Sequence, residues 1–377
     1  MSKAQWIQSV NALTCDRCLE SKSKGDRFCS FCGSDLSYIE CNECEEHRRK
    51  GERFCSFCGN EVNPPEKETA LSKATVLAGI ILTIALSLYL VYESITAIWG
   101  ITAVWSHLPS YTHGLFIVIP KVVTFFRFSG TAVQIYYLLI MIAVLSSVVY
   151  LFVMSYKPVK EEGIKGLKKT PIYEVMALFS ALIFLEVMYV LILNALGVDT
   201  KSPFDEEDWE MMFSLLNASV YEEIICRILY LGVPMCILGL ILKKKGTTVS
   251  GYIFGGFGMS KLSFVFVVFS AAMFAMAHLG GWGWWKILPT FLFGLITGFL
   301  FCKYGIYATV SIHFLTDYIS AATWLSNPIA GLLYTIAILA AFFGGIAFVQ
   351  PYTSKGINWL RKEFGKKSSE ESGKDSL

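Results

Sequence analysis

Long apolar segments, separated by short polar connections, fill the sequence from residue 74 to residue 350. Hydrophobic residues make up 54% of the 377 positions and charged residues only 16%, which excludes a disordered chain and argues against an ordinary soluble domain. A transmembrane helix needs about 20 consecutive apolar residues. The sequence therefore predicts an all-α polytopic membrane protein with about eight transmembrane helices, at residues 74–99, 131–155, 173–197, 214–242, 262–280, 286–303, 306–325 and 329–350.

The distribution of basic residues predicts the orientation of these helices. Lysine and arginine gather at residues 157–169, 243–245 and 355–367, and basic connections favour the cytoplasmic side of a membrane. Both termini are then expected in the cytoplasm of a multi-pass cell-membrane protein. Residues 114–128 contain a proline and two basic residues, so we expect this segment to lie at the interface rather than to span. A polar tail, residues 351–377, follows the last predicted span.

The first 62 residues contain a tandem cysteine repeat. Residues 25–33 recur almost unchanged at residues 51–59, and every cysteine of the first unit has a counterpart 26 residues later. Each unit holds two Cys-x-x-Cys pairs, the arrangement that presents four thiolates to one tetrahedral metal ion. The predicted metal ligands are Cys15, Cys18, Cys29 and Cys32 in the first unit, and Cys41, Cys44, Cys55 and Cys58 in the second.

Metal binding also explains how such short units fold. Each unit is only 18 residues long from its first to its last cysteine, too short for a hydrophobic core of its own. We therefore predict two structural zinc ions, one in each unit. A disulfide scaffold is the alternative, but cytoplasmic thiols stay reduced. The repeat is similar to the zinc-ribbon modules of many prokaryotic membrane proteins, which implies a docking or regulatory module with a possible protein partner. Residues 63–73 are expected to be a linker.

Six ionisable side chains interrupt three of the predicted spans, where charge is costly and commonly functional. Glu223 and Arg227 are four residues apart and share one helical face, whereas Glu222 points about 100° away. Arg227 can therefore neutralise Glu223 and leave Glu222 facing a cavity, as a general base for water. The alternative is a structural salt bridge between helices.

Two later spans carry histidine. Phe274 and His278 share one helical face, and His313 and Asp317 converge four residues apart in another span. Taken alone, His278 is typical of a hydrogen-bonded or interfacial residue, and the His313–Asp317 pair is also consistent with a structural hydrogen bond. Together with Glu222 they form a set of a base, imidazoles and a carboxylate, which could orient water directly or bind a metal ion.

These motifs resemble those of a known family. Glu-Glu-x-x-x-Arg, Phe-x-x-x-His and His-x-x-x-Asp, in this order on successive hydrophobic helices, look like the CPBP family of intramembrane proteases. This family includes type II CAAX prenyl endopeptidases and the Abi group of bacteriocin-processing or immunity proteins. The resemblance covers residues 170–350 and implies a helical membrane core of about eight helices.

The resemblance also implies a role for each residue. Glu222 would activate the attacking water with help from His278, and Glu223 and Arg227 would support the site. His313 and Asp317 would stabilise the oxyanion or contribute to a catalytic metal site. Family members often have asparagine at the position of Asp317. An aspartate donates a hydrogen bond only when it is protonated, so the alternatives for Asp317 are to bind a metal ion or to orient His313.

The leading hypothesis is therefore an intramembrane endopeptidase that cleaves a membrane-associated or prenylated protein. The net charge of +2 gives no reason to expect a nucleic-acid partner. A non-enzymatic scaffold or an immunity-type protein with a zinc-ribbon interaction module is the alternative, in which the same residues form structural ion pairs. A transporter with a carboxylate proton relay is a third possibility, although no inverted repeat is visible.

Overall fold

The computed structural model describes residues 17–36, 43–50, 52–57, 60–62, 70–119, 121–200, 206–242, 247–325 and 329–349. The chain divides into two compact units, Met1–Lys73 and Ala74–Leu377, and each is considered by itself. Three predicted metal ligands, Cys15, Cys41 and Cys58, lie outside the described residues, as does the predicted tail.

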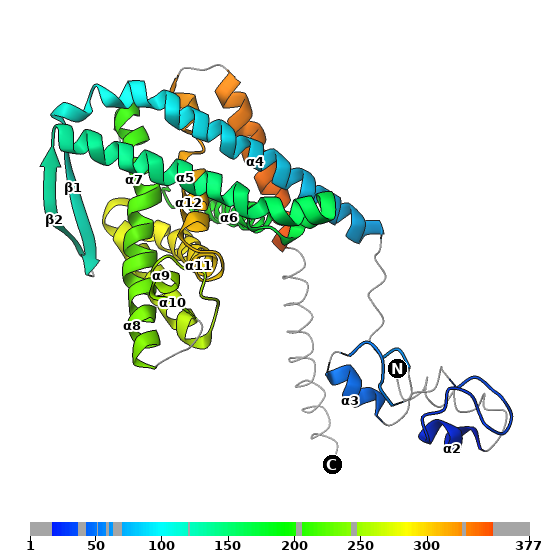
Figure 1. Ribbon diagram of the computed structural model, residues 1–377. Coiled ribbons are helices and arrows are strands. Elements are labelled where there is room, and N and C mark those ends of the chain that lie inside the picture. The colour runs from blue at the N-terminus through cyan, green and yellow to red at the C-terminus, as the bar shows by residue number, and fades with distance from the viewer. Residues whose placement is uncertain are drawn as a thin grey trace, which may run out of the picture. The chain divides into compact units, whose positions relative to one another are not determined.

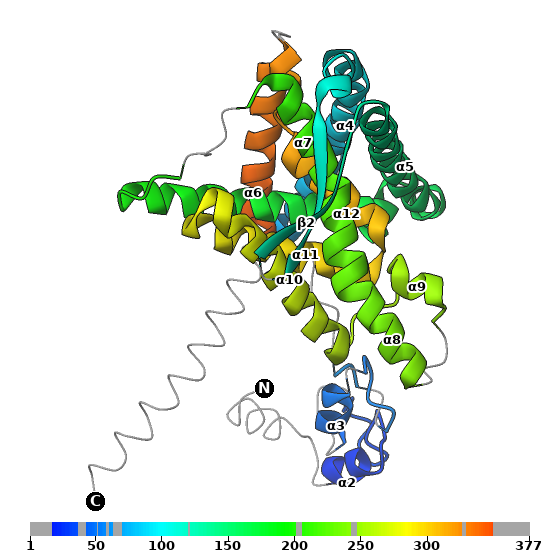
Figure 2. The same cartoon turned by 90° about the vertical axis from the view of Figure 1, so that its left-hand side faces the viewer.

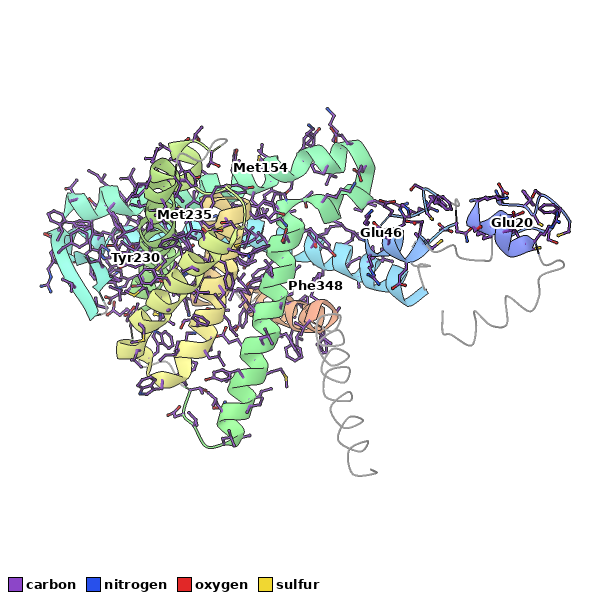
Figure 3. All side chains as sticks on the ribbon, turned by 90° about the horizontal axis from the view of Figure 1, so that it is seen from below. Glu20, Glu46, Met154, Tyr230, Met235 and Phe348 are labelled. Carbon is purple, nitrogen blue, oxygen red and sulfur yellow. The ribbon has the colours of Figure 1, made fainter. Side chains whose placement is uncertain are left out.

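The N-terminal unit repeats in structure as it does in sequence. Helices α2 (Cys18–Ser23) and α3 (Cys44–Arg49) occupy equivalent places in the two cysteine repeats, and each has a glutamate in its first turn, labelled Glu20 and Glu46 in Figure 3. The Cys29 and Cys55 amides each donate a 2.8 Å hydrogen bond to a carbonyl five residues later. A single fold is therefore built twice.

The two cysteine repeats contact each other within this unit. The buried Lys22 ammonium donates to Oδ1 of Asn60 at 2.9 Å. Gly25 has φ of +89°, and a Cβ atom there would lie 2.7 Å from the carbonyl oxygen of Phe57. Both the backbone conformation and the close approach require glycine at this position. The second half of the repeat thus fixes the shape of the first.

The second unit is a helical assembly (Figure 1). Its first half contains α4 (Ala70–Trp105), η1 (Leu108–Ser110), β1 (Thr112–Ile119), β2 (Lys121–Ser129), α5 (Thr131–Glu162), η2 (Gly163–Lys169) and α6 (Pro171–Ala195). Its second half contains α7 (Asp208–Glu223), η3 (Ile224–Gly232), α8 (Val233–Ile241), α9 (Val249–Ile253), α10 (Lys261–Trp282), η4 (Trp284–Lys286), α11 (Ile287–Lys303), α12 (Ile306–Tyr318), η5 (Ala321–Leu325) and a last helix, Ile329–Val349.

The prediction of a polytopic helical membrane protein is confirmed. Among the described residues, six helical stretches are long and apolar enough to cross a membrane, and the longest, Thr131–Ala195, contains both α5 and α6. The predicted span at 306–325 is instead the 13-residue helix α12 followed by the short η5. Nearly every side chain of α12 is buried, because neighbouring helices surround it.

The segment expected at the interface, residues 114–128, forms most of an antiparallel hairpin. Strands β1 and β2 pair with Val118 opposite Val122 and Phe116 opposite Thr124. β-Branched and aromatic residues fill both strands, which favours extended backbone over helix. The hairpin is the part of the membrane unit that the sequence reasoning did not anticipate.

Helix α7 continues through η3 into α8 without a break, as Figure 2 shows. Residues Ile224–Gly232 have π-helical hydrogen bonding, which is rare and often found at functional sites. The wider turn begins directly after Glu223, so it changes the directions of the side chains that follow the paired glutamates.

Candidate active site

The two adjacent glutamates occupy different environments. Glu223 is fully buried, whereas the side chain of Glu222 retains 22% of its exposure and lines a cavity. They lie at the end of α7, where the π-helical turn begins. The structure therefore places one carboxylate within the protein and presents the other to the cavity.

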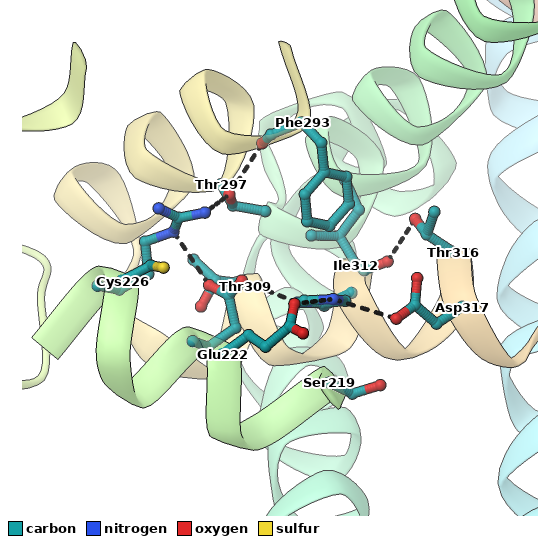
Figure 4. A network of polar contacts seen from close by, with 12 residues as sticks. Ser219, Glu222, Cys226, Phe293, Thr297, Thr309, Ile312, Thr316 and Asp317 are labelled. Atoms are coloured by element: carbon teal, nitrogen blue, oxygen red, sulfur yellow. Dashed lines mark hydrogen bonds and ion pairs between the residues drawn. The ribbon is translucent and has the colours of Figure 1, made fainter. Parts of the chain in front are cut away.

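Arg227 is the buried centre of a polar network. Its Nε donates to Oε2 of Glu223 at 3.1 Å, and neither side chain is exposed. Its Nη1 donates to the Ser270 hydroxyl at 2.7 Å, and its Nη2 donates to the Thr297 hydroxyl, part of which Figure 4 shows. A buried charge is tolerated only when it is paired and hydrogen-bonded. Arg227 thus joins α10 and α11 to η3 at the site.

His313 lies between carboxylates at both ring nitrogens. Its Nδ1 is 2.9 Å from Oε1 of Glu223, and its Nε2 is 3.2 Å from Oδ2 of Asp317. The same Nε2 is 3.7 Å from Oε2 of Glu222. Figure 4 shows Glu222 and Asp317 on the two facing helices that hold this ring. A doubly protonated imidazole donates to two carboxylates at once, and no other form of the ring does.

His278 lines the cavity, and one of its ring nitrogens is bound to the backbone. Its Nδ1 is 2.9 Å from the carbonyl oxygen of Phe274, which is only an acceptor, so this nitrogen donates. In the neutral ring Nε2 then carries the lone pair. The His278 imidazole of α10 and the Glu222 carboxylate of α7 thus share one cavity.

One cavity of about 900 Å³ receives these residues. The four predicted side chains Glu222, His278, His313 and Asp317 all line it, together with apolar residues of α6, α11 and the hairpin. His278 lies near the end of the predicted span 262–280, whereas His313 lies near the middle of the predicted span 306–325. The helices nevertheless bring both histidines to the same cavity wall.

Sequence reasoning missed the neutral partners and one charged pair. Ser270 and Thr297 hold Arg227, but hydroxyls in apolar spans are common and carry no distinguishing signal. Glu186 and Lys286 also line the cavity and form an ion pair at 3.2 Å. Glu186 lies inside a predicted span, so the cost of burying charge was a signal that could have identified it.

The donor atoms of this cavity do not match a metal site. Within the described part of the chain, one group of three or more possible ligands has its donor atoms all within 4.8 Å of one another, and it is Cys18, Cys29 and Cys32. The cavity residues Glu222, His278, His313 and Asp317 form no such group. No step is therefore derived through a catalytic metal.

The cysteine group does fit a metal ion. The sulfur atoms of Cys18 and Cys32 are 3.5 Å apart, and Cys29 is buried beside them. Burial raises the pKa of the Cys29 thiol, but hydrogen bonds from the backbone of Cys32 and Phe31 outweigh it and lower the pKa overall. A thiol that ionises readily suits a metal ligand. In the second cysteine repeat, Cys44 and Cys55 are both buried in the equivalent cluster.

Comparison with known families gives one match. Residues 206–319 match the family described as Type II CAAX prenyl endopeptidase Rce1-like. The match contains the whole constellation from Glu222 to Asp317, and it confirms the family resemblance inferred from the motifs. Neither the curated proteins nor the solved structures contain a significant match.

Proposed function

Residues 206–319 form an Rce1-like CAAX prenyl endopeptidase domain, and from this premise we propose that the protein is an intramembrane endopeptidase. Its substrate is a membrane-associated or prenylated protein. The observation that carries the proposal is the convergence of Glu222, His278 and His313, from three separate helices of the matched region, on one cavity.

Glu222 is the general base in this proposal. It is the cavity-facing carboxylate, and His278 lines the same cavity. A water held between the Glu222 carboxylate and the Nε2 lone pair of His278 loses a proton to Glu222 as its oxygen attacks the substrate carbonyl. Such positioned proton transfer contributes about 10²–10⁴-fold to a rate.

The positive charge of the doubly protonated His313 ring stabilises the negative charge that forms on the substrate oxygen, while its Nε2–H donates to Asp317. Its Nε2 is the ring nitrogen nearest Glu222, at 3.7 Å from the carboxylate. The tetrahedral intermediate collapses when the C–N bond breaks and Glu222 returns its proton to the leaving amine. The products are a carboxylic acid, which keeps the second proton of the water, and a free amine, so protons and electrons balance within these steps.

The remaining residues position this machinery. Asp317, 3.2 Å from Nε2 of His313, keeps that nitrogen protonated and holds the ring in place. Glu223 connects the His313 ring to Arg227 through its two carboxylate oxygens. We assign Asp317, Glu223 and Arg227 as positioning residues rather than as groups that touch the substrate.

The N-terminal unit is proposed to be a double zinc ribbon with one structural zinc ion in each half. Support comes from the clustered Cys18, Cys29 and Cys32 and from the repeated backbone around Cys44 and Cys55. The bound ion would hold the thiolates together in a unit with little hydrophobic core. Its proposed role is to bind a protein partner or substrate in the cytoplasm, where we expect both termini from the distribution of basic residues.

Proteolysis in heavy-oxygen water tests the proposed function. Purified protein in lipid nanodiscs is incubated with a library of membrane-anchored and prenylated peptides, and the products are analysed by mass spectrometry. Direct attack by water predicts one heavy oxygen in each new carboxylate. Well-folded protein that cleaves none of the peptides, and whose Glu222→Ala and His278→Ala variants lose only stability, would instead indicate the scaffold alternative.

A further inference from the structure

The hairpin forms part of the catalytic cavity wall. His113 and Phe116 of β1 and Val122 of β2 line the same cavity as Glu222. Strand β1 is the inner strand and β2 the outer one, as Figure 1 shows. An extended segment therefore lies beside the residues that would cleave a peptide, and the inner end of β2 reaches the cavity at Val122.

Two tyrosines hydrogen-bond to the backbone of β1. Both belong to the continuous helix formed by α7 and η3, which carries Glu222 and is called the catalytic helix below. The Tyr230 hydroxyl donates to the Val118 carbonyl at 2.6 Å and accepts from the Val118 amide at 3.2 Å. The Tyr221 hydroxyl donates to the Phe116 carbonyl at 2.6 Å. Tyr221 directly precedes Glu222 in the chain. These bonds attach the hairpin to the helical segment that carries Glu222. They use the amide and carbonyl groups of β1 that point away from β2.

The same bonds show which groups of β2 point away from the hairpin. The amide and carbonyl of Val118 point away from β2, toward Tyr230, so the Val118–Val122 pair is a non-hydrogen-bonded pair of the ladder. The amide and carbonyl of Val122 therefore point away from β1, at the opposite edge of the hairpin. The carbonyl of Phe116 also points away from β2, toward Tyr221. The backbone groups of Thr124, the partner of Phe116, therefore point away from β1, as those of Val122 do. The outer edge of β2 thus begins at the cavity with the backbone groups of Val122 and Thr124.

This edge has no partner within the part of the chain that the structure describes. Beyond the pairing with β1, no backbone hydrogen bond reaches β2. Its side chains are exposed and largely apolar, with Val122 at 53% and Phe125 at 59%. Open sheet edges are not tolerated in hydrocarbon, and long exposed apolar edges are templates for pairing with another strand. An added strand would satisfy both conditions.

We propose that an extended segment of the substrate pairs with the outer edge of β2 and passes Val122 into the cavity. This inference rests on the proposed function, and it adds how the peptide is recognised. Backbone pairing gives affinity that is largely independent of sequence, while alternate side chains give selectivity. The occupant is a peptide rather than a second copy of the chain, because the edge begins at the cavity and β1 is attached to the catalytic helix.

Binding of N-methylated peptides tests this pairing. Farnesylated synthetic peptides, each methylated at one backbone amide, are titrated against the full-length Glu222→Gln protein in nanodiscs, so that binding is measured without cleavage. A paired strand uses every second amide. Methylation at alternate positions is therefore expected to weaken binding about fivefold, the effect of one hydrogen bond, with little effect in between. Uniform or absent effects would overturn the proposal.

A second comparison tests β2 itself. Thr124→Pro removes the outward amide, which is not part of the β1 ladder, and should weaken peptide binding about fivefold. Thr124→Val keeps this amide and is expected to bind within about twofold of the parent. Equal affinities for the two variants would contradict the proposal. A disulfide between two copies of Thr124→Cys protein that still forms when peptide is added would also contradict it, because a second copy of the chain would then occupy the edge.

These measurements separate the two proposals. If the wild type cleaves peptides but binding shows no alternation, the strand pairing is wrong and the endopeptidase stands. If Glu222→Gln protein binds with alternation but the wild type cleaves nothing, the pairing stands and the endopeptidase is wrong.

Discussion

At the scale of single residues, the network depends on one buried cation. Arg227 has no exposed surface and binds Glu223, Ser270 and Thr297. Removal of one partner from a buried ion pair is costly because it leaves the other charge uncompensated. Arg227 and Glu223 therefore stabilise the assembly as well as the site.

Arg227→Met is predicted to lower the free energy of unfolding by about 3–5 kcal/mol, because Glu223 then loses its buried counterion. Ser270→Ala, the matched control, removes one hydrogen bond from the same guanidinium and should cost about 1–3 kcal/mol. Denaturation in detergent micelles measures both. An Arg227→Met protein as stable as Ser270→Ala would show that the ion pair contributes little.

A second buried carboxyl gives the opposite prediction. Glu93 of α4 is buried, and neither of its oxygens has a hydrogen-bond partner among the described residues. A buried polar group without a partner costs about 1–3 kcal/mol. Glu93→Met is therefore expected to raise the melting temperature. A lower melting temperature would mean that the Glu93 carboxyl has a stabilising interaction.

Two features of the sequence predicted the candidate site. They are the angular spacing of side chains around a helix and the free-energy cost of placing charged side chains in a membrane. The unequal exposure of Glu222 and Glu223 follows from their 100° separation, and the Glu223–Arg227 pair follows from their spacing of four. The contact of His313 with Glu223 did not follow, because it depends on how α12 packs against α7. Spacing along one helix says nothing about such contacts between helices.

At the scale of elements, apolar length predicted the spans and propensity alone could have suggested the hairpin. The proline and the two basic residues of segment 114–128 indicated an interfacial segment, whereas its β-branched and aromatic residues favour strands. The π-helical turn after Glu223 could not be read from sequence, because hydrogen-bond register in a helix is set by its neighbours. These two unpredicted elements both lie at the cavity.

The packing of α10 against α11 gives an element-scale prediction. A Cβ atom at Gly294 would lie 2.8 Å from the Cα of Ala271, which cannot move aside as a side chain can. Gly294→Ala should therefore destabilise the protein by about 1–3 kcal/mol. Gly331→Ala is the control, because a Cβ there meets nothing within 4 Å. Equal melting temperatures of the two variants would refute this close packing.

At the scale of the whole molecule, two compact units predict two separable unfolding events. We expect two zinc ions for each chain, lost together in a protein with both Cys29→Ser and Cys55→Ser. Because the metal holds only the ribbons, its removal should leave the melting of the membrane unit unchanged. Elemental analysis and calorimetry measure the two effects. Retained zinc in the double variant would contradict the ribbon assignment.

Glu222 is the residue on which the account of the whole enzyme depends. The direct measurement is the rate at which Glu222→Gln protein cleaves a membrane-anchored peptide that the wild type cleaves. Glu174→Gln, the same change at a carboxylate bound to Lys303 outside the cavity, is the control. The account predicts that Glu222→Gln stays folded and loses about 10²–10⁴-fold in rate while Glu174→Gln stays active. Folded Glu222→Gln protein with the wild-type rate would contradict it.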